Sequence, residues 1–504
     1  MHSNLFDVLL SGRSRAGGNN VIALTVEDGT TWTYAALDAA SANLAGVLRD
    51  AGVGAGDRVV AQVGKSAQAI ALYLAVLRIG ATYVPLNTDY TAVEVARFVA
   101  DAEPALLVAS QESINAVVPL DQQHCRAAIS LEPDGSGELV RRSLSTVPFD
   151  SVAATAADDV AAILYTSGTT GRSKGAMLTH ENLAFVTRTL CESWEITTSD
   201  VLLHALPLFH AHGLFIAAGP ALYAGAKIHL LPKFTVEGVL ERLPSSTVFM
   251  GIPTFYTRLL ANSKFDRERC AHVRLFTSGS APLSAEVFKE FEQRIGYAIL
   301  ERYGLTETTI VSSNPVRGPR LAGTVGYPLP GVDVRVVPSG DGPSDVGELE
   351  VRGPNVFKGY WRMPEQTAQE FRDDGFFKTG DIARLADDGR ITLVGRAKDM
   401  IISGGYNVYP REVEEVLCAA PGIHDAAVVG VPHPDFGEGV IAVAECDPGK
   451  DSPTEAQVLT AVAQVLAKYK VPKRLFFVDA LPRNAMGKVL KSDLRKFYAA
   501  VFSN

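Results

Sequence analysis

A strand–helix–strand pattern near the N-terminus constrains the fold of this chain more than any other feature. Residues 57–63 have the composition of a strand, residues 66–79 have the spacing of a helix with an N-cap at Ser66 and a stop at Gly80, and residues 81–85 form a second short strand. Two strands joined by a crossover helix pair in parallel, and a parallel sheet needs helices on its faces. The pattern therefore predicts an α/β fold.

The alternation of helices and strands continues along the first two thirds of the chain. Helical spacing recurs at residues 34–48, and a strand-like run follows at residues 105–108. Later apolar strands that end in glycine and polar residues occur within residues 202–213, 248–253, 273–282 and 299–308. Because ligands collect beyond the carboxyl ends of parallel strands, we expect these endings to converge on one crevice.

The pattern changes after about residue 321, where glycine and proline punctuate shorter strands. The strands predicted there are residues 332–337, 347–351 and 391–395. They are typical of a small antiparallel, barrel-like part of the large domain. We expect an N-terminal domain of helix-covered parallel sheets over residues 1–395.

The last part of the chain has the pattern of a small α+β unit. It contains a predicted helix at residues 410–419, a strand at 426–431 and an amphipathic stretch at 454–469. About 110 residues is a usual size for a domain. We therefore expect a mobile C-terminal domain over residues 396–504, with its hinge around residues 395–398.

Composition and charge exclude several classes of function. The chain has 504 residues, a formal net charge of −9 and no extended block of lysine or arginine, which argues against a nucleic-acid-binding surface. The five cysteines are scattered without metal-ligand spacing, as in a reduced protein. No 18-residue apolar run or signal-peptide pattern occurs, so we expect no membrane span and a cytoplasmic location.

A loop rich in glycine and hydroxyl groups follows the apolar run at residues 160–164. Residues 166–175 contain three glycines, five hydroxyl side chains and the cations Arg172 and Lys174. Glycines let backbone N–H groups turn inward around an anion, and the hydroxyls and cations add donors and charge. The loop therefore predicts a binding site for a triphosphate, although its order is not that of the common P-loop. A flexible hairpin without a chemical role is the alternative.

Six motifs in one order give a specific resemblance. They occur at residues 166–175, 303–307, 379–381, 395–399, 404–414 and 482–488. With these motifs the chain resembles the adenylate-forming enzymes, which include acyl- and aryl-CoA synthetases, firefly-type luciferases and nonribosomal-peptide adenylation domains. The resemblance covers roughly residues 160–490.

The resemblance implies a first half-reaction in which a carboxylate attacks the α-phosphate of ATP. Catalysis then depends on positioning and on neutralising the charge of the transferred group. The implied catalytic residues are Lys488, which bridges carboxylate and α-phosphate, Thr306, which contacts that phosphate, Glu307, which holds Mg²⁺, and His210, which lies beside the acyl carboxylate. The implied nucleotide-binding residues are Thr166, Ser167, Gly168, Thr169, Thr170, Gly171, Lys174, Gly279, Ser280, Ala281, Tyr303, Asp381 and Arg396.

Each assignment has a plain structural alternative. Lys488 could be a solvated lysine, Asp381 a turn residue and Glu307 a helix-start glutamate. Tyr303 and His210 could be core side chains, since buried tyrosines and histidines are common.

A second half-reaction transfers the acyl group to the thiol of coenzyme A. In the family the small domain rotates about the position of Lys398, so that Lys488 leaves the site and the loop Gly404–Gly405–Tyr406 faces the adenylate. Glycines in that loop would let a thin pantetheine arm pass. An ordinary tight turn is the alternative.

The choice of acid depends on Arg302, which precedes the Tyr303 that should stack on adenine. A guanidinium facing a small pocket is costly unless it is paired, so it favours a substrate with a second carboxylate. A salt bridge between Arg302 and Glu301 or another nearby acid is the structural alternative, and Arg258 and Arg274 are less favoured candidates for the same task.

Four stretches resemble the malonyl-CoA synthetases. They are residues 209–215, 251–260, 301–308 and 353–364. The resemblance implies Arg302, His210 and Ser278 as acyl-substrate residues. The predicted activity is an acid–CoA ligase that makes malonyl-CoA, and also methylmalonyl-CoA, through an acyl-AMP intermediate with ATP, Mg²⁺ and coenzyme A.

Two alternatives to this activity remain open. One is a CoA ligase for another short or aromatic monocarboxylic acid, and the other is a stand-alone adenylation enzyme that loads a carrier protein. The motif Pro482-x-x-x-x-Gly487-Lys488 also resembles the site at which bacterial acyl-CoA synthetases are acetylated. We therefore expect a lysine acetyltransferase and a deacetylase as partners acting on Lys488.

Overall fold

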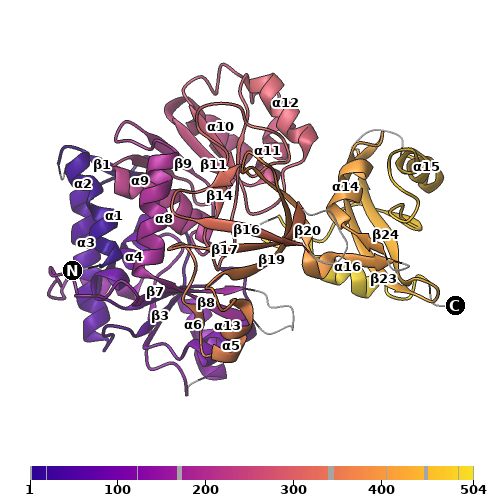
Figure 1. Ribbon diagram of the computed structural model, residues 1–504. Coiled ribbons are helices and arrows are strands. Elements are labelled where there is room, and N and C mark those ends of the chain that lie inside the picture. The colour runs from indigo at the N-terminus through magenta and orange to yellow at the C-terminus, as the bar shows by residue number, and fades with distance from the viewer. Residues whose placement is uncertain are drawn as a thin grey trace.

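A computed structural model describes residues 3–18, 20–121, 123–166, 173–338, 345–403, 406–447, 452–485 and 487–502. Two large sheets with helices around them make up the N-terminal part of the molecule, and a small antiparallel sheet lies next to them (Figure 1). The C-terminal elements, in orange and yellow, form a separate body at one side of the view (Figure 1). The α/β class predicted from the sequence is confirmed.

The first large sheet carries most of the expected strand endings. Its nine strands, in spatial order, are β15 (Tyr327–Pro328), β14 (Ser312–Ser313), β13 (Leu300–Tyr303), β12 (Leu275–Ser278), β11 (Val248–Gly251), β9 (Val201–His204), β10 (Lys227–Leu230), β1 (Ile22–Val26) and β2 (Thr31–Thr33). The strands from β13 to β1 pair in parallel, and β14, β15 and β2 are antiparallel additions at the two edges. Parallel pairing brings the carboxyl ends of β9, β11, β12 and β13 to one side of the sheet.

The second large sheet contains the strand–helix–strand unit that the sequence predicts. Its seven strands are β18 (Gly359–Tyr360), β8 (Lys174–Thr179), β7 (Val160–Thr166), β4 (Thr82–Pro85), β3 (Arg58–Gln62), β5 (Leu106–Ala109) and β6 (Ala128–Ser130). Helix α4 (Ala67–Arg78) joins β3 to β4, and the Ser66 hydroxyl caps it by accepting from the backbone N–H of Ala69. Strands β7 and β8 form a hairpin around the glycine-rich loop.

Helices cover both sheets, because their apolar faces need burial against the strands. In the N-terminal part they are α1 (Leu5–Leu10), α2 (Gly12–Arg15), α3 (Tyr34–Asp50), α5 (Ala92–Ala102), α6 (Gln111–Val117), α7 (Glu138–Ser143), α8 (His180–Ser193), α9 (Gly219–Ala224), α10 (Val236–Arg242), α11 (Pro253–Leu260), α12 (Ala285–Ile295) and α13 (Pro364–Glu370). Residues His212–Ala218 form a π-helix, η2. No helix in the described part of the chain combines the length and the apolar character that a membrane span requires.

The barrel-like part predicted after residue 321 is a four-stranded antiparallel sheet. It consists of β16 (Asp333–Pro338), β17 (Val346–Arg352), β19 (Phe377–Leu385) and β20 (Ile391–Arg396). The short 3₁₀ turn η4 (Ala397–Asp399) follows β20 directly. The proposed hinge residues therefore come at the end of a paired strand.

The C-terminal unit has buried clusters of its own. Its strands are β21 (Ile401–Ser403), β22 (Tyr406–Val408), β23 (Ile423–His433), β24 (Gly437–Cys446) and β25 (Arg474–Val478), and its helices are α14 (Pro410–Cys418), α15 (Glu455–Val465) and α16 (Lys491–Phe497). Buried side chains between Ile401 and Leu494 form two clusters that include no residue before 401. These separate clusters are consistent with a domain boundary near residue 395.

The amphipathic stretch at residues 454–469 is helical only in part. Helix α15 begins at the capping box of Thr454 and Gln457 and ends at Val465, because Leu466 is extended. The ring of Tyr469, beyond the helix, stacks on the ring of Tyr406 with 4.8 Å between ring centres. The helix thus ends before Tyr469, whose ring packs on Tyr406 of the distant strand β22.

Candidate active site

A buried guanidinium without an acid partner lies at the carboxyl end of β13. Arg302 is only 5% exposed, and Nε and Nη2 of its side chain have no hydrogen-bond partner among the described residues. Burial lowers the pKa of Arg302 to about 10. Among the described residues no ion pair joins Arg302 to Glu301 or to another acid, and neighbouring residues of a strand point to opposite faces of the sheet. The alternative of a structural Arg302–Glu301 salt bridge is therefore wrong.

The backbone of Gly279 forms the floor beneath this guanidinium. A Cβ atom at residue 279 would lie 2.4 Å from Cζ of Arg302 and 2.5 Å from its Nε. The absence of a side chain therefore allows the guanidinium to lie against the strand ending of β12. The next residue, Ser280, has a φ of 71°, a left-handed conformation that is uncommon for serine.

Two histidines after β9, His210 before the π-helix η2 and His212 as its first residue, lie near the same guanidinium. The backbone N–H of His212 donates to Nδ1 of His210 over 3.2 Å, and Nδ1 of His212 lies 3.2 Å from the Ser280 hydroxyl. Burial, followed by the charge of Arg302, lowers the pKa of His210 to about 4 and that of His212 well below its usual range. Both imidazoles are thus neutral at pH 7, and the accepting Nδ1 of His210 leaves its proton on Nε2.

Lys65 and His204 form another buried contact near His212. Lys65, which follows β3, donates from Nζ to the carbonyl oxygen of His204 over 2.8 Å. Burial lowers the pKa of Lys65, and burial followed by the charge of Lys65 lowers that of His204 to about 3. The sequence did not identify either residue, because a lone lysine on one sheet gives no local sign of a partner on another sheet.

The remaining acyl-site candidate, Ser278, lies elsewhere on the sheet. Ser278 pairs in register with Glu301 of β13 and with Gly251 of β11. Paired residues of neighbouring parallel strands share a face, so Ser278 faces the side of Glu301 and not that of Arg302. The structure thus brings His210 to Arg302 but does not bring Ser278 there.

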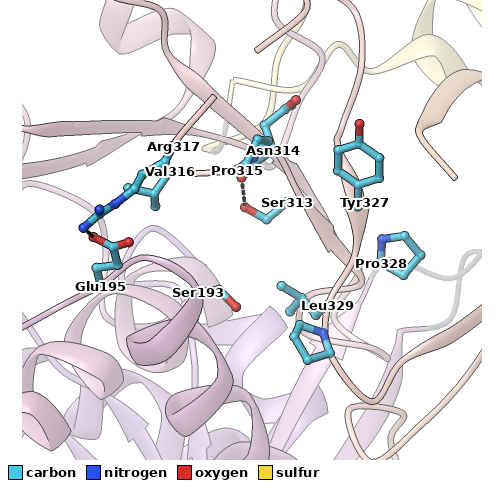
Figure 2. A pocket seen from close by; sticks show the side chains of 11 residues that line it. Ser193, Glu195, Ser313, Asn314, Pro315, Val316, Arg317, Tyr327, Pro328 and Leu329 are labelled. Carbon is cyan, nitrogen blue, oxygen red and sulfur yellow. Dashed lines mark hydrogen bonds and ion pairs between the residues drawn. The ribbon is translucent and has the colours of Figure 1, made fainter. Parts of the chain in front are cut away.

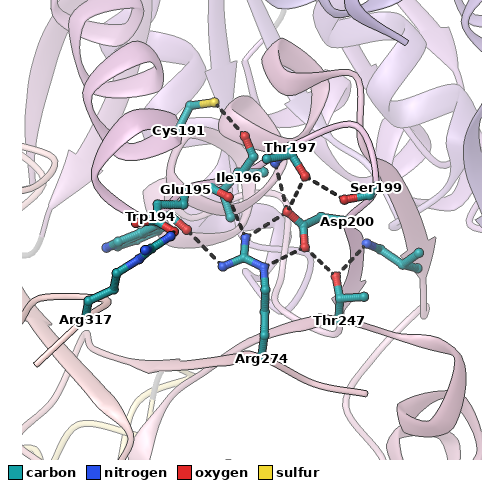
Figure 3. A network of polar contacts seen from close by, with 11 residues as sticks. Cys191, Trp194, Glu195, Ile196, Thr197, Ser199, Asp200, Thr247, Arg274 and Arg317 are labelled. Atoms are coloured by element: carbon teal, nitrogen blue, oxygen red, sulfur yellow. Dashed lines mark hydrogen bonds and ion pairs between the residues drawn. The ribbon is translucent and has the colours of Figure 1, made fainter. Parts of the chain in front are cut away.

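The two competing arginines have other contacts. Arg274 binds Asp200 through two nitrogens, with Nε 2.9 Å from Oδ1 and Nη2 2.7 Å from Oδ2, and it also donates to the carbonyl oxygens of Trp194 and Glu195 (Figure 3). Arg258 is exposed and lies over the ring of Phe234 at 5.0 Å. Arg274 is therefore a structural clamp, and of these three arginines only Arg302 is both buried and unpaired.

The predicted ribose-binding group is built by paired strands. Asp381 of β19 lies opposite Arg396 of β20, and the Arg396 Nε is 2.7 Å from Asp381 Oδ1. The Tyr303 hydroxyl donates to the other carboxylate oxygen of Asp381 over 2.5 Å. Three predicted nucleotide-binding residues from three strands therefore meet in one network, in which Tyr303 and Asp381 are buried and Arg396 is partly exposed.

Glu307 and Lys174 lie at another point of the predicted site. The Tyr360 hydroxyl donates to Oε1 of Glu307 over 2.9 Å, and Nζ of Lys174 lies 3.3 Å from Oε1 of Glu370. Thr306 is partly exposed beside Glu307. No group of three or more histidine, cysteine, aspartate or glutamate side chains that could hold a metal occurs among the described residues. A single carboxylate nevertheless fits Mg²⁺, which usually takes one or two carboxylates and completes its shell with substrate phosphates and water.

The glycine-rich loop is described only at its two ends. The Thr166 hydroxyl donates to the Lys174 carbonyl oxygen over 3.5 Å where β7 and β8 begin to separate. The predicted phosphate-binding residues Ser167, Gly168, Thr169, Thr170 and Gly171 lie outside the described residues, as do Gly404 and Gly405. Tyr406 is 59% exposed and stacks on Tyr469 of the same unit.

Lys488 reaches the network of Asp381 and Arg396 from the C-terminal unit. A tight turn presents it: the N–H of Gly487 donates to the Asn484 carbonyl oxygen, and Gly487 has a φ of 74°. The same glycine docks on the start of α11, where a Cβ would lie 2.9 Å from the Thr254 side chain. Burial, followed by the charge of Arg396, lowers the pKa of Lys488 to about 8, and the residue as a whole keeps an exposed surface.

The predicted pivot, Lys398, lies beside this network. Burial, followed by the charge of Arg396, lowers the pKa of Lys398. Its neighbour Asp399 is bound by Arg495 of α16 over 2.6 Å. Lys398 thus belongs to the short segment that connects β20 to the C-terminal unit.

A separate hollow lies outside the predicted site. It has a volume of about 310 Å³ and is lined by residues of β14, β15 and the turn after α8, including the ion pair of Arg317 and Glu195 at 2.8 Å (Figure 2). None of the predicted site residues lines it.

Comparisons with known proteins agree with this arrangement. Residues 13–361 match the AMP-binding enzyme family, and residues 412–488 match the AMP-binding enzyme C-terminal domain. Among curated proteins, a malonate–CoA ligase of Arabidopsis thaliana is 36% identical over 86% of this chain and 76% of its own. A mitochondrial malonate–CoA ligase of Mus musculus is 38% identical over 83% and 77%. A feruloyl-CoA synthase of Amycolatopsis sp is 37% identical over 93% and 94%.

Solved structures add information on the arrangement of the two units. ATP-bound MatB from Rhodopseudomonas palustris is 47% identical and superposes with a TM-score of 0.96 over 100% of both chains, whereas apo MatB from the same organism superposes with 0.85 over the same lengths. A benzoate CoA ligase from Burkholderia xenovorans LB400 is 27% identical, with a TM-score of 0.86 over 98% of this chain and 99% of that one. The arrangement in this chain is therefore more similar to the ATP-bound MatB structure than to the apo structure.

Proposed function

Because the chain belongs to the family of AMP-binding enzymes, we propose that it is an ATP-dependent malonate–CoA ligase that forms malonyl-CoA through an acyl-AMP intermediate. In the first step a malonate carboxylate oxygen bonds to the α-phosphorus, and the bond from that phosphorus to pyrophosphate breaks. In the second step the sulfur of coenzyme A bonds to the acyl carbon and AMP leaves. The net products are malonyl-CoA, AMP and pyrophosphate.

The observation that carries the choice of malonate is the unpaired Arg302. A buried guanidinium with neutral histidines around it and no acid partner among the described residues has an uncompensated positive charge. The distal carboxylate of a dicarboxylic acid supplies the missing charge and two acceptor oxygens that match the guanidinium fork. A monocarboxylic acid would leave the charge unpaired, which is expensive in a buried site.

The other residues have proposed roles toward ATP. Tyr303 stacks on adenine against the backbone of Gly279, Ser280 and Ala281, Asp381 and Arg396 hold the ribose, and the loop from Thr166 to Lys174 holds the phosphates. Glu307 binds Mg²⁺, which when bound neutralises phosphate charge, and Thr306 contacts the α-phosphate. Lys488 bridges the reacting carboxylate and the α-phosphate, a role that fits its approach to Asp381 and Arg396.

The C-terminal domain has a proposed second position. Rotation about Lys398 would withdraw Lys488 and bring the loop of Gly404, Gly405 and Tyr406 to the adenylate for coenzyme A. The exposed Tyr406 supports this proposal, because its ring stacks on Tyr469 of the same unit and leaves more than half of the residue open to a ligand. Acetylation of Lys488 by an acetyltransferase, reversed by a deacetylase, is the proposed control, and a cytoplasmic location stays a prediction.

An acid panel tests the proposed function directly. CoA-dependent AMP formation should be fastest with malonate, followed by methylmalonate. It should be slow with acetate, propionate and butyrate, which lack a second carboxylate, and with succinate, whose second carboxylate is one methylene further from the first and does not match the fixed guanidinium. Ferulate and benzoate belong in the panel because relatives of this chain are named for aromatic acids. Faster turnover of any monocarboxylic acid than of malonate would refute the choice of a dicarboxylate. Transfer to a carrier protein, but not to coenzyme A, would instead favour a carrier-loading enzyme.

A further inference from the structure

The lysine at the end of the glycine-rich loop is held by a carboxylate from a distant helix. Nζ of Lys174, the first residue of β8, lies 3.3 Å from Oε1 of Glu370, the last residue of α13. It also lies 4.7 Å from the centre of the Tyr360 ring. The Lys174 side chain is 13% exposed and that of Glu370 is 27% exposed, so the pair is partly shielded from water.

The surrounding backbone fixes the place of this pair. Strand β18 pairs antiparallel with β8, with Tyr360 opposite Ala176, and the N–H of Trp361 donates to the Gly175 carbonyl oxygen over 2.7 Å. Tyr360 therefore lies beside the first residues of β8, where Lys174 begins.

Helix α13 is fastened to the same strand. The Thr367 hydroxyl accepts from the Tyr360 N–H over 2.9 Å and donates to the Met363 carbonyl oxygen over 2.8 Å. Glu370 lies three residues after Thr367 and so on the same face of the helix. Nε2 of Gln366 donates to Oε1 of Glu370 over 3.0 Å, which further orders that carboxylate. The position of Glu370 is thus set by contacts other than its ion pair.

Tyr360 places this ion pair next to the proposed metal ligand. Its ring faces the Lys174 ammonium, while its hydroxyl donates to Glu307 over 2.9 Å. Burial, followed by the charge of Glu307, raises the pKa of Tyr360, and the charge of Glu370 adds to this effect. Lys174 and its partner Glu370 therefore lie next to Glu307, the residue to which we assign Mg²⁺ binding.

We propose that Glu370 is a positioning residue that occupies Lys174 in the absence of nucleotide and is exchanged for the phosphates when ATP binds. The proposal rests on the proposed assignment of Lys174 to the nucleotide phosphates. Glu370 orders the lysine but also competes for it, since a carboxylate and a phosphate are alternative partners of one ammonium. A partly exposed ion pair shifts such an equilibrium by about 1.5-fold to fivefold.

Binding measurements on the full chain test this exchange. The dissociation constants of ATP and of pyrophosphate are measured by calorimetry with Mg²⁺ and without any acid or coenzyme A. Glu370→Gln keeps the shape of the side chain and removes its charge, so both ligands should bind about two- to fivefold more tightly. In turnover the KM for ATP should fall while kcat stays level or falls, because pyrophosphate leaves more slowly. Glu365→Gln, an exposed carboxylate on the same helix, is the matched control and should change neither constant.

A double-mutant cycle identifies the route of the effect. In a Lys174→Ala background, Glu370→Gln should no longer tighten ATP binding, because the competition needs the lysine. Glu370→Asp, which keeps the charge on a shorter stem, should tighten binding only in part. Thermal unfolding of each variant shows that the fold is kept.

Three results would overturn the proposal. Weaker ATP binding in Glu370→Gln would mean that Glu370 helps nucleotide binding and does not compete with it. If Glu370→Gln tightened ATP binding equally with and without Lys174, the effect would come from the loss of a negative charge near the anionic nucleotide and not from competition for the lysine. Unchanged ATP affinity in Lys174→Ala alone would mean that Lys174 does not contact the phosphates. Malonate-dependent turnover in the acid panel would then still support the proposed reaction, so the two failures can be told apart.

Discussion

Replacing Arg302 by alanine should change which acid the enzyme uses more than it changes the fold. The guanidinium is the one buried arginine described here whose Nε and Nη2 both lack a partner, and it stands over the bare backbone of Gly279. We expect Arg302→Ala to cut kcat/KM for malonate by about two to three powers of ten, while activity with propionate or butyrate stays level or rises.

The magnitude follows from the burial of the charge. Lowering the pKa of Arg302 to about 10 by burial corresponds to a cost of about 3 kcal/mol for keeping the charged form in the folded protein. Because the pKa of this cation is depressed in the folded state, the protein carries the cost at every pH below about 10 unless a dicarboxylic acid is bound. A bound distal carboxylate offsets it. Removing one member of such a pair costs roughly 2–5 kcal/mol of binding, and each 1.36 kcal/mol is about tenfold in rate.

The assay is CoA-dependent AMP formation across malonate, propionate and butyrate, with thermal unfolding in parallel. Malonate should raise the melting temperature of the unmodified enzyme, and it should do so much less in Arg302→Ala. Arg302→Lys should recover only part of the malonate activity, since a single ammonium cannot reproduce the planar fork.

Arg274→Ala serves as the control, because Arg274 is bound to Asp200 and to two carbonyl groups at the opposite ends of the strands. It should lower the melting temperature by an amount equivalent to roughly 1–3 kcal/mol while leaving the ratio of malonate to butyrate activity unchanged. If Arg302→Ala weakens malonate and butyrate equally, Arg302 is structural and the reasoning from its missing partner is refuted.

Four further predictions concern Lys488 and the hinge. Lys488→Ala should abolish malonate-dependent pyrophosphate exchange but spare thioester formation from supplied malonyl-adenylate; equal loss of both would contradict its assignment to the first step. With the Lys488 pKa lowered to about 8, kcat/KM for ATP should decline above about pH 8 as the ammonium loses its proton, and a profile that is flat to about pH 9.5 would argue against a catalytic ammonium. Lys398→Pro should spare pyrophosphate exchange and stop thioester formation, because proline fixes φ at the pivot; unchanged CoA turnover would place the hinge elsewhere. Acetylation of Lys488 should stop adenylation until a deacetylase acts, and fully active enzyme that mass spectrometry finds acetylated at Lys488 would exclude this control.

The sequence alone determined the elements and the reaction class of this protein. Strand β3, helix α4 and strand β4 follow the predicted ranges closely, because the Ser66 cap, the Gly80 stop and the apolar spacing are local signals. The six motifs in order led to the AMP-binding enzyme family, which the comparisons confirm. Local pattern failed where a distant contact decided the conformation, as at residues 466–469, where Tyr469 packs on Tyr406.

Only the tertiary structure decided which charged groups are paired. Arg274 and Arg302 look alike in the sequence, yet Arg274 binds Asp200, 74 residues away, while Arg302 has no acid partner among the described residues. Lys174 likewise meets Glu370, which lies 196 residues away in the sequence, because β18 adds to the edge of β8 and carries α13 with it. Strand order and the burial of each face determine these pairings, and both depend on how segments far apart in the chain pack together, which local spacing and capping cannot encode.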